Sequence, residues 1–182
     1  MTLRSLDVCV VGVLAIGIAA CSPSPGPEAR GASRVFPYSS GCGPGPYVIP
    51  TVGTPTSERV AGDRITDGDD GDVDCSVTKS GGSYRIRGSL EEGATSFAIG
   101  GSVIAVPDTG VFQSEGATGS VSFYHPNSGN ISSETCTIEV LENQEIGTGK
   151  VWGNFDCTQS TKEANPGFAC NFEGSFIFEN CN

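Results

Sequence analysis

The stretch that decides the fold class is Tyr84-Arg85-Ile86-Arg87-Gly88-Ser89-Leu90. Its apolar side chains fall at alternate positions, Tyr84, Ile86 and Leu90, and arginine or serine stands at the positions that flank them. Successive side chains of a β-strand point to opposite faces of the sheet. The pattern therefore predicts a strand that covers a core with one face and meets water with the other.

Similar short segments recur from Val35 onward, each bounded by Gly, Asn, Asp or Pro, and no window carries an apolar stripe of helical period. We expect an all-β fold, an antiparallel β-sandwich or small barrel of eight or nine short strands stapled by disulfides. The expected strands are 47–52, 73–78, 84–90, 96–106 (in one or two pieces), 119–124, 136–141, 150–157, 168–172 and 175–179.

Composition excludes several classes of protein. The chain has 182 residues with 26 glycines and 11 prolines, only 17% of its residues are charged, and its net charge is −11. A coiled coil needs charge-rich helical repeats, and a multi-pass membrane protein needs several long apolar spans. An acidic surface repels phosphates, and the basic residues are scattered, with Arg85 and Arg87 as the densest pair. We therefore expect no nucleic-acid partner.

An uncharged run of thirteen residues, Val8 to Ala20, lies close to the amino terminus and is followed at once by Cys21. Thirteen helical residues span roughly 20 Å, which is too short for a bilayer core of about 30 Å. The length is typical of the apolar region of a secretory signal peptide.

The end of this run, Ile18-Ala19-Ala20-Cys21, resembles the bacterial lipobox. The resemblance implies that Cys21 receives a diacylglycerol and that residues 1–20 are removed as a signal peptide. Two or three acyl chains would anchor the protein firmly in a membrane. Ser22 stands after the cysteine, and its likeness to lipoproteins of diderm bacteria implies outer-membrane sorting in such a host. The expected location is the bacterial cell envelope. An ordinary signal peptide followed by a chance cysteine is the alternative.

Three regions follow from this reading: a signal peptide at 1–20, the lipidated Cys21 with a flexible tether at 21–34, and a single β-rich domain at 35–182. The tether assignment rests on Ser22–Ser33, which is rich in Pro, Gly and Ser and has no apolar period.

Eight cysteines are present, and six remain once Cys9 leaves with the signal peptide and Cys21 carries lipid. An even number in an exported chain predicts disulfides. The six are Cys42, Cys75, Cys136, Cys157, Cys170 and Cys181. The first hypothesis joins Cys136–Cys157, Cys170–Cys181 and Cys42–Cys75. A rival hypothesis joins Cys157–Cys181 and Cys136–Cys170.

The segment from Asp63 to Asp74 holds six carboxylates in twelve residues, which repel one another unless a hard cation relieves them. The calcium-ligand candidates are Asp63, Asp67, Asp69, Asp72 and Asp74. Asp63, Asp67 and Gly68 fit the spacing of an EF-hand loop, whereas Ile65 breaks it. A solvated acidic loop that leads into a strand is the alternative, and no other cofactor is expected.

No catalytic residue stands out. His125, the single histidine, lies in His125-Pro126-Asn127, which is typical of a turn, and the chain lacks a G-x-S-x-G motif. Trp152 is expected to share a strand face with Asn154 and Asp156, where it could stack on a sugar ring or close one end of the core.

Two hairpin-like stretches are weakly alike: a strand led by Cys75 or Cys136, a glycine-bearing loop, and a strand with Gly88-Ser-Leu90 or Gly153-Asn-Phe155. One hairpin type used twice and chance similarity both explain this likeness.

The carboxy-terminal half also resembles a loose class of uncharacterised secreted bacterial lipoproteins. Its marks are Cys136-x-Ile-x-Val140, the run from Gly149 to Cys157, and the ending from Ala169 to Cys181. The resemblance implies a disulfide-bonded β domain and transfers no activity.

The sequence thus favours a lipid-anchored, non-enzymatic envelope protein that binds an extracytoplasmic protein or a glycan, or that is structural. The alternative is a glycan-directed envelope hydrolase that uses an Asp/Glu pair.

Overall fold

The structure is a computed structural model that describes residues 26–36, 65–68, 71–114, 116, 119–127, 129–162 and 165–182, with side chains left out for 28–36, 65–66, 159–170 and 172. Within these residues the protein is all-β, antiparallel and without a helix, as the sequence predicts. No described segment is a helix of the length and apolarity that a membrane span requires.

Eleven strands are present in the described part of the chain. They are β1 (Glu28–Phe36), β2 (Ile65–Thr66), β3 (Asp72–Ser80), β4 (Ser83–Glu92), β5 (Thr95–Ala105), β6 (Phe112–Ser114), β7 (Gly119–His125), β8 (Gly129–Val140), β9 (Glu145–Gly147), β10 (Lys150–Lys162) and β11 (Asn165–Glu179).

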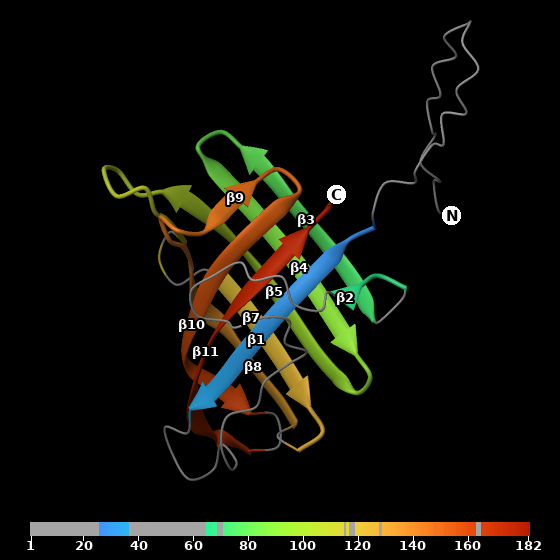
Figure 1. Ribbon diagram of the computed structural model, residues 1–182. Coiled ribbons are helices and arrows are strands. Elements are labelled where there is room, and N and C mark those ends of the chain that lie inside the picture. The colour runs from blue at the N-terminus through green and yellow to red at the C-terminus, as the bar shows by residue number, and fades with distance from the viewer. Residues whose placement is uncertain are drawn as a thin grey trace, which may run out of the picture.

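All of them belong to one hydrogen-bonded sheet with the order β2-β1-β11-β10-β8-β6-β5-β4-β3. Strand β7 also lies between β5 and β8, beside β6, and β9 pairs with β10. The sheet curls so that β1, β11 and β10 cross in front of β4, β5 and β7 (Figure 1). The hydrophobic core therefore lies between two facing layers of the same sheet.

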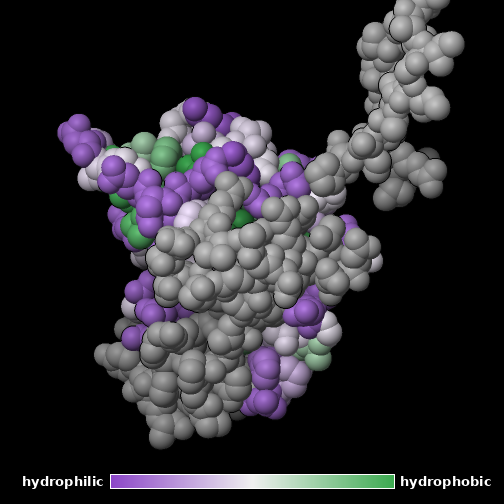
Figure 2. All heavy atoms as spheres, in the orientation of Figure 1, coloured by the Kyte–Doolittle hydropathy of each residue, from purple (hydrophilic) through white to green (hydrophobic). Residues whose placement is uncertain are grey.

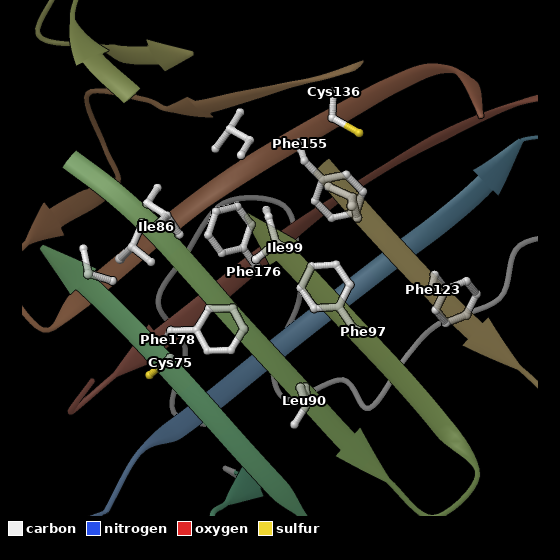
Figure 3. Close-up of a cluster of buried hydrophobic side chains, with 14 of the residues drawn as sticks. Cys75, Ile86, Leu90, Phe97, Ile99, Phe123, Cys136, Phe155, Phe176 and Phe178 are labelled. Atoms are coloured by element: carbon white, nitrogen blue, oxygen red, sulfur yellow. The ribbon is translucent and has the colours of Figure 1, made fainter. Parts of the chain in front are cut away.

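The alternation that predicts β4 is present in the structure. Ile86 and Leu90 are fully buried, and Arg85 and Arg87 are exposed. The same alternation on the other long strands fills the core. Its largest fully buried side chains include Phe97, Phe123, Phe176, Phe178, Ile86 and Leu90, which Figure 3 labels. Ile131 and Ile138 are also fully buried. Hydrophilic residues predominate on the described surface in Figure 2.

Two glycines leave room for phenyl rings of β11, Gly88 in the facing layer and Gly153 on the neighbouring strand β10. A β-carbon added at Gly88 of β4 would lie 2.4 Å from Cζ of Phe178, which belongs to β11 in the facing layer. A β-carbon at Gly153 of β10 would lie 3.1 Å from Cζ of Phe176 and 2.9 Å from the Glu139 carbonyl oxygen. The two glycines of the weakly similar hairpins thus have the same role, since each leaves room for a phenyl ring of β11.

One disulfide joins neighbouring strands. Cys136 of β8 and Cys157 of β10 stand directly opposite each other, with a Cα–Cα distance of 4.1 Å, and both are fully buried. This bond was among those expected, and the structure confirms it.

A second disulfide joins Cys75 of β3 to Cys181, 106 residues later. The expected pairs Cys170–Cys181 and Cys42–Cys75 are therefore wrong, as is the rival pair Cys157–Cys181, because curling of the sheet carries the end of β11 to β3. The rival Cys136–Cys170 is wrong because Cys136 bonds to Cys157. Cys42 and the Cys170 side chain lie outside the described residues, so a third bond, expected from six cysteines, stays a prediction.

The Cys75–Cys181 bond is one of several contacts that cover the outer edge of β3. The Asn182 N–H donates to the Cys75 carbonyl (3.1 Å), and the Gly149 N–H donates to the Val77 carbonyl (2.9 Å). Further along the edge, the Val73 N–H donates to Oδ1 of Asp67 (3.1 Å). An edge strand with open backbone groups invites pairing with other chains, and these contacts occupy three of its groups.

The structure differs from the expected strands in several places. Residues 28–34, expected in the tether, belong to β1, which pairs with β11 over nine residues through backbone hydrogen bonds that need no apolar pattern. Of the two forms expected for 96–106, the structure has the single strand, β5, whereas β11 joins the two last expected strands and β8 begins at Gly129, before the expected 136–141. The short strands β2, β6 and β9 are too brief for an alternation to be visible. The expected strand 47–52 lies outside the described residues.

Substituting Gly88 by alanine is expected to destabilise the protein by about 1–3 kcal/mol, the usual cost of overpacking a core. The added methyl group would overlap the Phe178 ring. Gly82→Ala is the matched control, because no atom lies within 4 Å of a β-carbon at that turn position. Urea unfolding followed by circular dichroism measures both variants, and equal losses would contradict the packing described above.

Removal of Cys75–Cys181 is expected to destabilise the protein more than removal of Cys136–Cys157. The chain-entropy model gives about 5 kcal/mol for the longer loop and about 3 kcal/mol for the shorter one. The comparison uses the double variants C75A/C181A and C136A/C157A under oxidising conditions, with thermal unfolding as the measurement. A larger loss in C136A/C157A would show that loop length does not decide the contribution.

Candidate functional site

The candidate site is the outer face of the layer formed by β3, β4, β5, β7 and β8. We call it the polar face and define it by the outward side chains that line one depression. They are Asp74, Ser76, Arg87, Ser89, Ala98, Gly100, Ser120, Ser122, Ser132 and Glu134.

Strand register sets these side chains in rows across the sheet. The first row is Asp74, Ser89, Ala98, Ser122 and Ser132, in which each residue is the direct partner of the next. The second row is Ser76, Arg87, Gly100 and Ser120. Directly opposed side chains on one face stand about 5 Å apart, so each row is a continuous line across four or five strands.

Small side chains make the depression. Serine, alanine and glycine fill most of the two rows, whereas longer side chains stand in the rows beyond them. Arg85 lies two residues from Arg87 along β4, and Tyr124, which is 43% exposed, lies two residues from Ser122 along β7. The resulting hollow has a volume of about 690 Å³, which is within the range of small-molecule pockets.

Both signs of charge border the depression. Asp74 and Glu134 stand at its two ends on β3 and β8, and Arg87 stands in the second row on β4. Among the described residues, neither Arg87 nor Arg85 forms an ion pair. The floor between the charges is neutral, and its Ser120 hydroxyl donates to the Gly100 carbonyl oxygen (3.4 Å).

The acidic segment expected to bind calcium does not gather into a cluster in the described part of the chain. Asp67 accepts the Val73 N–H, and the Gly68 N–H donates to the Gly71 carbonyl (2.9 Å). Asp72 and Asp74 point outward from β3 and are exposed. Asp63 and Asp69 lie outside the described residues. No group of three or more His, Cys, Asp or Glu among the described residues could hold a metal ion.

Trp152 lies on the face of β10 that points away from the core, as its alternation with Val151 and Gly153 predicts. Its strand partners are Ile177 of β11 and Glu145 of β9. Only 9% of the residue is exposed, so the indole offers little surface to a sugar ring in this arrangement.

His125 ends β7 at the turn to β8, and its Nδ1 accepts the Asn127 N–H (3.1 Å). This contact agrees with the turn that the sequence predicts. The imidazole thus takes part in the local geometry of the hairpin.

The positions of the described carboxylates limit which two of them could act as the acid pair of a glycosidase. Asp74 and Glu134 are separated by four strand spacings, about 19 Å along the sheet. The two carboxyl groups of a glycosidase stand about 5–9.5 Å apart. Asp72 and Glu91 do face each other directly on β3 and β4, but both are exposed and neither lines the depression.

The sequence analysis singled out none of the serines on the polar face. The alternation within each strand already places four of these serines at solvent-facing positions. They are Ser76, Ser89, Ser120 and Ser122. Only the register between strands shows that they form one surface.

A comparison of the chain with family models, with curated proteins and with solved structures finds no match. The geometry described above therefore carries the functional argument alone.

Proposed function

We propose that this chain is a lipid-anchored protein of the bacterial cell envelope that binds a ligand on its polar face without transforming it. The observation that carries the proposal is the depression of about 690 Å³ on an outer sheet face, floored by small hydroxyl-bearing side chains and bordered by Arg87 and two carboxylates. A surface of this kind offers hydrogen bonds to a polar extracytoplasmic partner, a glycan or a protein segment.

Export is supported by the cysteines. Two disulfides, Cys75–Cys181 and Cys136–Cys157, are typical of proteins that leave the reducing cytoplasm. The proposed membrane anchor is the lipid on Cys21, which rests on the lipobox-like Ile18–Cys21. Outer-membrane attachment follows if the host is diderm. The anchor residues lie outside the described part of the chain.

The geometry favours binding over the alternative of a glycan-directed hydrolase. Hydrolysis by an acid pair needs two carboxyl groups on either side of one bond. The two carboxylates that line the depression, Asp74 and Glu134, are too far apart along the sheet to act together. No observation on the described residues favours the hydrolase.

Labelling of cells with radioactive palmitate tests the anchor. The wild-type protein is expected to take up label and to remain with the membrane fraction, because Cys21 carries the acyl chains. The Cys21→Ala variant is expected to lose both properties, whereas Cys9→Ala serves as the control that keeps them. Undiminished labelling of Cys21→Ala would overturn the proposed anchor.

Obstruction of the depression tests the binding face. Ser122→Trp places an indole on the floor of the first row and is expected to abolish retention on any glycan or peptide that the wild type binds in an array. Asn143→Trp, in the exposed turn between β8 and β9, is the control with an equal gain in apolar area. Circular dichroism and the melting temperature establish that both variants fold. Equal binding by both variants would place the ligand elsewhere.

A further inference from the structure

The two described disulfides leave one pair of cysteines in the exported part of the chain. They use four of the eight cysteines. The proposed export removes one more with the signal peptide and attaches lipid to another. Two cysteines then remain without an assigned partner, Cys42 and Cys170.

The register of β1 brings the chain that precedes Cys42 to the side of Cys170. The backbone of Cys170 belongs to β11. Phe36, the last residue of β1, stands directly opposite Asn171, the next residue of β11. Paired residues of an antiparallel sheet have Cα atoms about 4.5–5.5 Å apart, and consecutive Cα atoms are about 3.8 Å apart. The Cα atom of Phe36 therefore lies within about 10 Å of that of Cys170.

The stretch between β1 and Cys42 is long enough for this pairing and suited to a change of direction. Five residues, 37–41, separate Phe36 from Cys42, and six steps of chain span at most about 20 Å. A disulfide needs Cα atoms about 4.4–6.8 Å apart, which such a stretch allows. Pro37 has no N–H to continue the ladder with β11, and Ser39-Ser40-Gly41 is typical of a turn.

From the remaining pair of thiols and the register of β1 we infer that Cys42 and Cys170 form a third disulfide. The inference rests on the proposed function, because export supplies both the count of two thiols and the oxidising compartment. One cysteine thiolate attacks the disulfide of a protein oxidant in the envelope, and the thiolate of the other cysteine displaces the oxidant from the mixed disulfide. The oxidant gains two electrons and leaves as a dithiol, with the two protons that the cysteines give up.

This bond fastens β1 to the sheet at the end that lies away from the proposed tether. Strand β1 pairs with β11 along its whole length, and its first two residues, Glu28 and Ala29, also pair with β2. A pull from the membrane anchor acts on the Glu28 end and would peel β1 from β11 one residue at a time. A cross-link shortly after Phe36 holds the far end of the strand covalently, so the peeled strand stays joined to β11.

The experiment maps the disulfides of the full-length protein, purified from membranes without reductant and alkylated with iodoacetamide under denaturing conditions. Digestion with trypsin and a protease that cleaves after glutamate separates Cys170 from Cys181 at Glu173. Mass spectrometry is expected to find one peptide pair that joins Cys42 to Cys170, and no alkylated cysteine.

Variants test the same pairing by the thiol that each leaves behind. Cys42→Ala is expected to give one alkylated thiol, at Cys170, and Cys170→Ala is expected to give one at Cys42. Ser40→Ala, two residues before Cys42, is the matched control and is expected to give none. The double variant C42A/C170A is expected to melt at a lower temperature than the wild type, because its unfolded chain is less constrained.

The outcomes separate this inference from the function on which it rests. Alkylation of both Cys42 and Cys170 in a wild-type protein that carries lipid on Cys21 would overturn the third bond and keep the anchor. A peptide that joins two copies of Cys42 or of Cys170, with a dimer on a non-reducing gel, would replace the bond by a link between chains. A peptide that joins Cys21 to either cysteine would overturn the anchor and the pairing together. The wild-type map decides the pairing even where a variant does not fold.

Discussion

The packing of two phenyl rings of β11 against the backbone of two glycines is the contact on which the rest of the structure depends. Phe178 of β11 reaches across the core to Gly88 of β4, and Phe176 packs over Gly153, its direct partner on the neighbouring strand β10. Phe178 also stacks near Phe97 of β5, with ring centroids 6.5 Å apart, and Phe97 meets Phe155 of β10 at 5.6 Å. Gly88 thus allows β11 to approach β4 closely, and the aromatic cluster fills the space between the layers (Figure 3).

Because side chains alternate between the two faces of a strand, the residues that form the core and those that form the polar face are separate sets. On β4, Ile86, Gly88 and Leu90 meet the core, whereas Arg87 and Ser89 belong to the polar face. A change on the outer positions leaves the inner contacts in place, because the two sets of side chains lie on opposite sides of the sheet. Selection can therefore alter the surface of β3, β4, β5, β7 and β8 without repacking the phenyl cluster.

Patterns within short stretches of sequence predicted the features that depend only on those stretches. The alternation of Tyr84–Leu90 gave a correct strand face, and Cys136–Cys157 was found because both cysteines lie on neighbouring strands of one hairpin region. The bond Cys75–Cys181 was missed, because it depends on how the whole sheet curls. The polar face was missed for a related reason: Ser89, Ala98 and Ser122 become one row only through the register of three strands. The sequence did not predict strand β1, because its backbone pairing with β11 requires no alternation of polar and apolar side chains.

Because Cys75 and Cys181 lie far apart in the sequence, the second cysteine is synthesised well after the first. A ribosome adds about 5–20 residues per second, so roughly 5–20 s pass between the two cysteines during synthesis. During that interval the Val77 carbonyl lacks its donor until Gly149 is added, and the Cys75 carbonyl lacks its donor until Asn182 is added. An incomplete chain therefore leaves this edge of β3 open to pairing with other chains until Asn182 has been added.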